Sequence, residues 1–501
     1  MSDQAAAISL ISPYTECKRH PHSAPKIDED SNPTIYLYPS LFKQRFANGN
    51  RREKASNGNR FVTGSQLNHN VQPPGVTSPN STRLPNGIRS KKGREDYIEP
   101  SSRAMGQSPP PTSITVSSKG AQRWAAGHPW IFRSDLVDPP SRPPGAVTVF
   151  DTRRKPLGIA LWSPRSEISL RLLDANPDAV IDHKWWHDRI ARAIRRRDPL
   201  RAHATAFRLV HAEGDAVPSL VCDRYDRWLV VQLLSAGIEQ HRDDIVAALT
   251  ALTGADGILA RNDPPVRARE GLPRETTLLA GDVPREIEVH EHGIRYIAAP
   301  WTGQKTGAFL DQREARVRIA HYARGHALDC FSYHGSFALH LARTADRVTA
   351  IDSSRAALER AAQNADRNGL TNIECVEANA FDYLRDQERA RTRFDTIVLD
   401  PPAFAKTRQA LTSALRGYHE INLRAMKLLA PGGTLYTASC SYHVSKPLFL
   451  EMIERAAADS GRRLALREFI GQPLDHPEVL TIPETGYIKG AILEAMDGPS
   501  P

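Results

Sequence analysis

Residues 327–352 read ALDCFSYHGSFALHLARTADRVTAID, and this stretch predicts the fold of the second half of the chain. An apolar run ends in Asp329 and Cys330, a loop around Gly335 follows, and a helical pattern leads to a second apolar run that ends in Asp352. The succession of strand, tight turn, helix and strand predicts a βαβ unit. Open α/β sheets bind ligands at the carboxyl ends of such strands, so we expect a binding site at this loop.

The loop also indicates which kind of ligand it binds. It lacks the G-x-G-x-x-G pattern that lets the backbone approach a pyrophosphate, and only Gly335 stands in the turn. Asp352, 23 residues beyond Asp329, is placed to accept hydrogen bonds from the two hydroxyls of a ribose. A nucleoside without phosphates satisfies both observations, which favours S-adenosylmethionine over NAD. The alternative is a βαβ unit that binds no ligand.

Strand-like and helical patterns continue to alternate after this unit. Further strands are expected at residues 372–376, 394–399, 434–438, 463–469 and 487–494. The alternation predicts an α/β fold, a Rossmann-like, doubly wound domain with about seven strands. Because the carboxyl ends of parallel strands meet at one edge of a sheet, Asp329, Asp352, Asp400 and Cys440 are expected to converge on one crevice.

Length and composition limit the class of protein. A chain of 501 residues suggests two to four domains. No apolar run approaches the roughly 20 residues of a membrane span, and no secretory signal opens the chain, so we expect no membrane association. Five cysteines are scattered without C-x-x-C spacing, which argues against a zinc site or a disulfide framework and favours a reducing, cytoplasmic setting.

The first 200 residues fall into segments that differ in composition and in hydrophobic pattern. Residues 1–110 are rich in Ser, Asn, Pro and Gly without a sustained period, which predicts a disordered leader. Residues 111–200 carry closely spaced strand-like runs and then a basic amphipathic helix, which predicts a small β-barrel domain. The inward residues of that helix are expected to be Ile181, Trp185, Ile190 and Ile194. Residues 201–300 predict a central α/β linking domain with no apparent chemistry.

Positive charge is concentrated in the predicted barrel. Residues 111–205 carry 16 Lys and Arg against 9 Asp and Glu, whereas residues 206–501 carry 35 against 39. Basic side chains alternate with aromatic ones in the barrel, which suits contact with an RNA backbone and its bases. We expect most of the tryptophans to be core and some of the arginines to contact RNA. The residues concerned are Trp124, Trp130, Trp162, Arg123, Arg133, Arg153, Arg154, Lys155, Arg165 and Arg171.

Two strand ends carry the predicted chemistry. Asp400-Pro401-Pro402-Ala403-Phe404 resembles the motif with which class I methyltransferases hold an amino group or the edge of a nucleobase. Cys440 supplies a soft nucleophile. C5 of cytosine is a poor nucleophile until a thiolate adds to C6. An inert buried thiol is the alternative for Cys440, and Cys330 is expected to be packed in this way.

Residues from about 114 to 498 resemble the bacterial 23S ribosomal RNA cytosine-C5 methyltransferases that carry an N-terminal PUA domain. The matching stretches are HPWIF at 128–132, TGQKTGAFLDQREAR at 302–316, CFSY at 330–333, DPP at 400–402, RGY at 416–418, SCS at 439–441 and YIKG at 487–490. The resemblance implies a PUA-like RNA-binding domain at 111–200, the linking domain, and a class I methyltransferase domain at 301–501. It also implies Cys440 as the nucleophile. Asn379 departs from the family, which usually has Asp near the adenine amino group, and no second cysteine lies beside Pro401.

The expected site has three groups of residues. Cys440 and Asp400 are the catalytic candidates, and Pro401, Pro402 and Phe404 are the substrate-binding ones. The candidates for S-adenosylmethionine are Gln304, Gln312, Arg313, Asp329, Phe331, Ser332, Tyr333, Gly335, Asp352, Ser353, Asn379, Ala380 and Asp400. No metal ligand is expected.

The expected activity is S-adenosylmethionine-dependent methylation of cytosine C5. The expected partner is 23S rRNA or a large-subunit assembly intermediate. A related methyltransferase that acts on guanine N7 without covalent catalysis is one alternative, and a non-catalytic RNA-binding assembly factor is another. The presence of Cys440 separates the expected activity from the first alternative. Binding of S-adenosylmethionine would separate it from the second. The oligomeric state and the modified nucleotide stay open.

Overall fold

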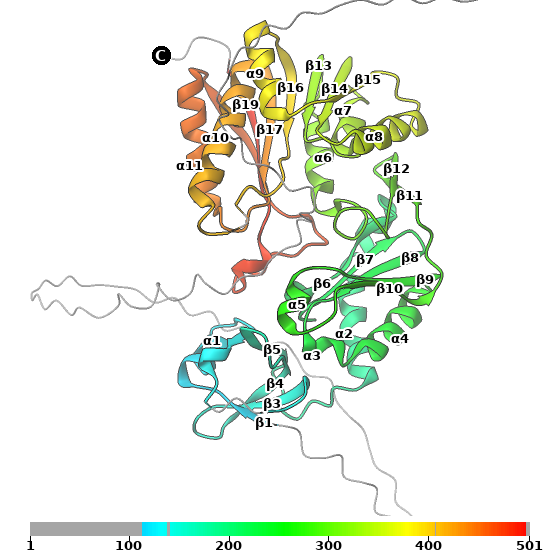
Figure 1. Ribbon diagram of the computed structural model, residues 1–501, viewed down its shortest axis with the longest axis vertical. Coiled ribbons are helices and arrows are strands. Elements are labelled where there is room, and N and C mark those ends of the chain that lie inside the picture. The colour runs from blue at the N-terminus through cyan, green and yellow to red at the C-terminus, as the bar shows by residue number, and fades with distance from the viewer. Residues whose placement is uncertain (1–112, 138–140, 406, 497–501) are drawn as a thin grey trace, which may run out of the picture. The chain divides into compact units, whose positions relative to one another are not determined.

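The computed structural model describes residues 113–137, 141–405 and 407–496 (Figure 1). The predicted leader at 1–110 lies outside the described residues. The described chain forms two five-stranded sheets, a two-stranded hairpin and a seven-stranded sheet. Within this part of the chain, no helix has the length and apolar character needed to cross a membrane.

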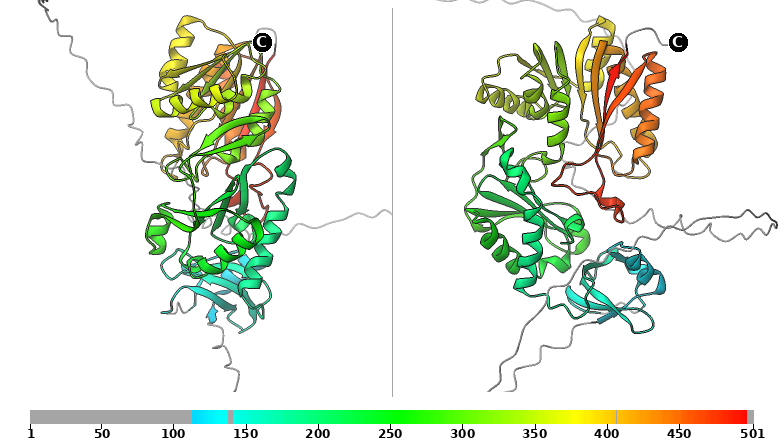
Figure 2. Two further views of the ribbon diagram at one scale, coloured as in Figure 1. Left: turned by 90° about the vertical axis from the view of Figure 1, so that its right-hand side faces the viewer. Right: turned by 180° about the vertical axis from the view of Figure 1, so that it is seen from behind.

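The first sheet has the order β1-β3-β4-β5-β2, and its strands curve strongly (Figure 2). Its elements are β1 (Ser113–Thr115), α1 (Ser118–Ala125), β2 (Trp130–Phe132), β3 (Gly145–Phe150), β4 (Pro156–Trp162) and β5 (Ile168–Asp174). The three tryptophans of this part are buried, which confirms that they are core residues. Arg171 was expected among the basic residues that could contact RNA, but it does not lie on the surface. It is buried and donates to Glu270 at 3.1 Å, because an arginine that faces a sheet interior needs an anionic partner.

The second sheet has the order β10-β9-β8-β7-β6 and is followed by the hairpin β11-β12. Its elements are β6 (Ala206–His211), β7 (Leu220–Tyr225), β8 (Trp228–Leu233), α3 (Ala236–Glu239), α4 (Arg242–Thr253), β9 (Gly257–Asn262), α5 (Val266–Glu270) and β10 (Glu275–Gly281). The hairpin consists of β11 (Ile287–Glu291) and β12 (Ile294–Ala298), as the sequence predicts. The outer strands β6 and β10 were not predicted.

The basic helix α2 (His183–Arg195) packs with the second sheet. Trp186, Ile190 and Ile194 enter the same hydrophobic core as Leu209 of β6, whereas Trp185 is only half-buried. Trp185 and Ile181 pack against the edge of this core, and Trp186, which the sequence did not mark, is the fully buried tryptophan of the helix. This packing groups α2 with the central region, although the sequence-based division groups it with the barrel.

The seven-stranded sheet has the order β15-β14-β13-β16-β17-β19-β18, with β19 antiparallel to its two neighbours. Its strands are β13 (His326–Cys330), β14 (Arg347–Asp352), β15 (Ile373–Glu377), β16 (Phe394–Leu399), β17 (Leu429–Ser439), β18 (Leu464–Ile470) and β19 (Lys489–Ala495). Helices α6 (Arg313–Ala320), α7 (Ser336–Leu341) and α8 (Arg355–Arg367) cover one face, and α9 (Ala380–Ala390), α10 (Leu411–Leu428) and α11 (Lys446–Ser460) cover the other (Figure 1). This confirms the predicted doubly wound α/β fold.

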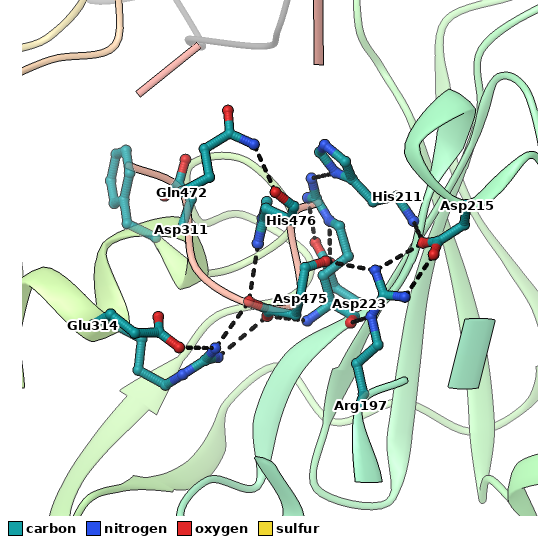
Figure 3. Close-up of polar contacts among 12 residues, drawn as sticks. Arg197, His211, Asp215, Asp223, Asp311, Glu314, Gln472, Asp475 and His476 are labelled. Carbon is teal, nitrogen blue, oxygen red and sulfur yellow. Dashed lines mark hydrogen bonds and ion pairs between the residues drawn. The ribbon is translucent and has the colours of Figure 1, made fainter. Parts of the chain in front are cut away.

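The segment at residues 471–488, between β18 and β19, connects this sheet to the second sheet (Figure 3). The buried carboxylate of Asp475 accepts hydrogen bonds from the Arg313 guanidinium at 2.8 and 3.2 Å and from the Arg208 backbone N–H at 2.8 Å. The Asp475 carbonyl accepts from Arg197 at 2.7 Å, and Arg197 is also bidentate to Asp215. Residues far apart in the chain thus share one buried ionic network.

Candidate active site

The four predicted residues lie at the carboxyl ends of strands in one sheet. Asp329 is in β13, Asp352 ends β14, Asp400 follows β16 and Cys440 follows β17. Burial, with smaller contributions from the Asp400 and Asp352 carboxylates, raises the pKa of Asp329 to about 7. Asp400 also contributes to the raised pKa of Cys440. Asp400 therefore acts electrostatically on both Asp329 and Cys440, as groups at one edge of a sheet do.

The loop after β13 has an unusual backbone conformation that orients Asp352. Phe331, Tyr333 and Gly335 all have positive φ, at 64°, 50° and 83°. The turn aims the Tyr333 backbone N–H at the Asp352 carboxylate, at 2.9 Å. The other Asp352 oxygen accepts from the Ser354 backbone N–H at 2.9 Å. Ser354, the residue after the cofactor candidate Ser353, is the N-cap of α8.

Asp329 is shaped to receive a cation. One of its carboxylate oxygens accepts from Ser332 at 2.7 Å and from the Ala338 backbone N–H at 2.9 Å. The other oxygen is buried and has no hydrogen-bond partner among the described residues. A buried carboxylate with one orphaned oxygen costs free energy unless a donor reaches it. The amino group of the methionine part of S-adenosylmethionine has the charge and the N–H donors to fit this position.

The segment before α6 lies against the same crevice. The Gln304 backbone N–H donates to the Tyr333 hydroxyl at 3.4 Å. The Gln312 side chain donates to Asp400 at 2.7 Å and accepts from the Tyr436 hydroxyl at 3.0 Å, so Gln312 fixes the Asp400 carboxylate. Arg313 instead donates to Asp475 and Glu314, which favours a structural role for this residue.

Asn379 and Ala380 stand at the start of α9. The Asn379 side-chain oxygen caps the helix by accepting from the backbone N–H groups of Phe381 at 2.9 Å and Asp382 at 3.4 Å. The Phe404 ring lies 6.4 Å from the Phe331 ring and 5.9 Å from the Phe381 ring. These aromatic residues form a continuous apolar wall between the cofactor loop and the loop of Pro401 and Pro402.

Ser441 ties the Asp-Pro-Pro loop to the strand end that carries Cys440. Its hydroxyl accepts from the Ala405 backbone N–H at 3.1 Å and lies 2.9 Å from the Tyr418 hydroxyl. Tyr418 in turn packs its ring 4.6 Å from that of Phe404. Asp400 and Cys440 are thus held in register by the residues just beyond them.

Cys440 is less buried than two of the other described cysteines. Cys222 and Cys330 are fully buried in hydrophobic clusters, as the sequence predicts for Cys330. Cys440 and Cys375 are half-buried. Burial raises the pKa of the Cys440 thiol to about 11, whereas Lys305 and Lys489 lower it. Burial also raises the pKa of Asp400 to about 7.

Sequence reasoning missed four residues of this region: Lys305, Tyr418, Ser441 and Lys489. Each of them lies inside a stretch that matches the resembled family, which was the available signal. Their chemistry was not apparent, because a serine, a tyrosine or a lysine near a motif has no pattern that separates it from a surface residue.

Comparisons with known proteins show two families along the chain. The PUA-like domain family matches residues 114–175, and the S-adenosylmethionine-dependent methyltransferase family matches residues 208–487. "Ribosomal RNA large subunit methyltransferase I" of Pseudoalteromonas atlantica is 39% identical over 377 residues, which cover 74% of this chain and 95% of the relative. The protein of the same name from Tolumonas auensis is 40% identical over 380 residues, covering 74% and 96%.

Two solved structures share the fold. A putative S-adenosylmethionine-dependent methyltransferase from Streptococcus mutans has a TM-score of 0.66 at 20% identity and covers 76% of this chain and 100% of its own. A putative methyltransferase solved with S-adenosylhomocysteine has a TM-score of 0.67 at the same identity and coverage.

Proposed function

Because the chain belongs to the S-adenosylmethionine-dependent methyltransferase family that includes bacterial large-subunit rRNA methyltransferases, we propose that it methylates C5 of a cytosine in 23S rRNA. Cys440 is the proposed nucleophile. The observation that carries this proposal is the shared anchoring of Cys440 and the Asp400 loop through Ser441. A nucleophile and a group that holds the base edge must be fixed relative to each other for attack on a ring carbon.

In the proposed mechanism the Cys440 thiolate attacks C6 of the cytosine, and the ring becomes enamine-like, with C5 nucleophilic. S-adenosylmethionine supplies the methyl group as an electrophilic sulfonium. A base from the solvent then takes the C5 proton, the electron pair of the C5–H bond re-forms the C5–C6 double bond, and the C6–S bond breaks to release the thiolate. Asp400 has a raised pKa of about 7, so near neutral pH its carboxyl can carry a proton and donate it to N3 of the cytosine. That hydrogen bond makes C6 more electrophilic.

The proposed cofactor contacts follow the crevice. Asp329 receives the methionine amino group, Asp352 the ribose hydroxyls, and Asn379 with Ala380 the adenine edge. Phe331, Ser332, Tyr333 and Gly335 shape the loop between them, with Gln304 and Ser353 at its border. Pro401, Pro402 and Phe404 contact the target base.

We also infer which part of the chain binds RNA and where that part ends. The PUA-like region supplies affinity for RNA, and the substrate is 23S rRNA or a large-subunit assembly intermediate in the cytoplasm. The packing of α2 on the second sheet favours a boundary near residue 175, where the PUA-like match ends, over one at residue 200.

RNA carrying 5-fluorocytosine at the target tests the nucleophile. Wild-type protein should form a covalent adduct with it, because fluorine cannot leave as the C5 proton does. Cys440→Ser and Cys440→Ala should form none, and their turnover should fall by several orders of magnitude, because a hydroxyl is hardly ionised near neutral pH. The adduct is detected as a band of raised mass on a denaturing gel.

Cys330→Ala is the matched control, since Cys330 is a buried cysteine at the end of β13 and should leave trapping intact. An adduct that persists without Cys440 assigns the nucleophile to another residue. A methyl group on guanine, with no trapping, replaces the proposal with guanine N7 methylation.

A further inference from the structure

The side-chain oxygen of Asn379 is engaged by its own helix. Asn379 is the N-cap of α9, and its Oδ1 accepts from the backbone N–H groups of Phe381 at 2.9 Å and Asp382 at 3.4 Å. The Asn379 carbonyl accepts from the Tyr383 N–H at 2.9 Å, which continues the helix. An amide oxygen has two lone pairs, and the cap uses both of them. Oδ1 therefore has no lone pair left for a ligand.

The amide nitrogen of Asn379 is the group that remains. Its Nδ2 carries two N–H donors, and within the described residues it takes part in no hydrogen bond. The residue is exposed, so a ligand can reach these donors. Reversal of the amide would set Nδ2 against two backbone N–H groups and leave them without an acceptor, which costs free energy. The cap therefore fixes the amide with its donor outward.

Asn379 lies next to the residue that is proposed to hold the ribose. Strands β14 and β15 pair side by side, with Asp352 opposite Glu377. One residue further on, the Ala378 backbone N–H donates to the Asp352 carbonyl at 2.9 Å. Asn379 is the next residue after this contact. Because the base of a nucleoside is bonded directly to its ribose, Asn379 is placed to meet the edge of that base.

Aromatic side chains surround the same place. The Phe404 ring lies 5.9 Å from the Phe381 ring on α9 and 6.4 Å from the Phe331 ring in the loop after β13. All three phenylalanines are only half-buried. Aromatic rings suit the faces of a flat purine, but they have no group that donates to or accepts from its edge. The edge of the base is therefore left to polar groups such as Nδ2 of Asn379.

An outward N–H donor selects one group of the adenine edge. Ring nitrogen N1 of adenine is an acceptor, whereas the neighbouring 6-amino group is a donor. Two donors that face each other are both left unsatisfied, which costs free energy. While it caps α9, Asn379 can thus donate to N1 but cannot accept from the 6-amino group.

We propose that Asn379 is a specificity-determining residue that donates through Nδ2 to N1 of the adenine of S-adenosylmethionine and makes no hydrogen bond with its 6-amino group. The inference rests on the proposed placement of the adenine edge at Asn379. It does not depend on which base of the RNA is methylated.

Calorimetric titration of the full-length protein with S-adenosylhomocysteine, its 6-desamino analogue and its 1-deaza analogue tests the proposal. In wild type, loss of the amino group should change the affinity by less than about threefold, and loss of N1 should weaken it about tenfold, as expected for one hydrogen bond. Asn379→Asp should reverse this order, because one carboxylate oxygen keeps the cap and the other accepts from the 6-amino group. The proposal is overturned if wild type loses affinity for the 6-desamino analogue or keeps it for the 1-deaza analogue.

Asn379→Ser distinguishes the helix cap from the contact with the cofactor. Serine caps a helix about as well as asparagine does, but it lacks Nδ2. The variant should unfold in urea as wild type does and should bind S-adenosylhomocysteine no more tightly than the 1-deaza analogue. A preference that persists in this variant would contradict the proposal.

Asp182→Ser is the matched control. It exchanges the N-cap of α2, whose side chain accepts from the Trp185 backbone N–H at 2.8 Å, and it should leave all three affinities unchanged. The readout is binding and not methyl transfer. If the analogues behave as expected but the methyl group appears on guanine, the contact of Asn379 stands and the proposed function fails.

Discussion

If Asp329 holds the methionine amino group, as proposed, cofactor binding should depend on pH. The pKa of Asp329 is raised to about 7 by burial, so the carboxyl is largely protonated at pH 6 and ionised at pH 8. A cationic amino group binds the ionised form, so binding should release a proton and affinity should rise with pH. The expected gain in S-adenosylmethionine affinity from pH 6 to pH 8 is about tenfold by linkage. Calorimetry in buffers of different ionisation enthalpy measures both quantities.

Asp329→Asn should weaken binding and flatten this pH dependence. Asp346→Asn is the control, because Asp346 is exposed and directly precedes β14, at the end of that strand opposite Asp352. It should behave as wild type. A wild-type affinity that is constant from pH 6 to pH 8 would remove Asp329 from the cofactor site.

The loop from β13 to α7 requires a glycine at position 335. Gly335 has φ 83°, and a Cβ added there would lie 2.9 Å from the Ala361 Cβ on α8. Gly369 has φ 64°, but a Cβ there would meet nothing within 4 Å. Replacing either glycine with alanine therefore carries the free-energy cost of a positive φ. Only the replacement of Gly335 also carries a steric clash.

Gly369→Ala should cost about 1–2 kcal/mol of stability, the penalty for a left-handed alanine, and leave cofactor affinity unchanged. Gly335→Ala should cost more and should also weaken S-adenosylmethionine binding, because α8 and the Tyr333–Asp352 contact must shift. Urea denaturation and calorimetric titration of both variants make the comparison. Equal behaviour of the two variants would contradict the close packing of this loop.

At the scale of the whole molecule, the Asp475 network should govern acid stability. Burial opposes ionisation, but His476 and Arg313 hold the pKa of Asp475 well below its usual range. Its contribution is therefore present above the unfolded pKa near 4 and is lost as pH falls through the lower folded value. Asp475→Asn removes the buried anionic partner of Arg313 and leaves it only the more exposed Glu314, which should cost about 3–5 kcal/mol at pH 7.

Thermal denaturation at pH 7 and at successive pH values from 4 down to 2 measures this effect, because the contribution is lost only below pH 4. Asp386→Asn breaks an exposed pair with Arg389 and should change stability by less than about 1 kcal/mol. If Asp475→Asn and Asp386→Asn lower the stability by equally small amounts, Asp475 does not stabilise the contact between the 471–488 segment and the second sheet.

The proposed RNA-binding surface is tested with exposed basic residues of the first sheet. Arg153→Ser with Lys155→Ser should weaken RNA binding and reduce the salt slope by up to about 1.8, since each lost phosphate contact removes about 0.7–0.9. Arg355→Ser with Arg389→Ser, on α8 and α9, is the charge-matched control. An unchanged salt slope for Arg153→Ser with Lys155→Ser would show that this surface does not contact RNA. Deletion of residues 1–200 is unsuitable, because it would remove Trp186 from the second core.

The sequence by itself determined the α/β class of the second half of the chain and the edge of the sheet at which Asp329, Asp352, Asp400 and Cys440 lie. Local period and turn residues mark strand ends, and the carboxyl ends of parallel strands necessarily meet at one edge. Tertiary structure alone decided that Lys489 lies against the Cys440 strand end, that Arg197 reaches Asp475 across 278 residues, and that Trp186 is the fully buried tryptophan of α2. These contacts depend on how elements pack, and neither the degree of burial on one helix nor a buried ion pair leaves a periodic trace in the chain.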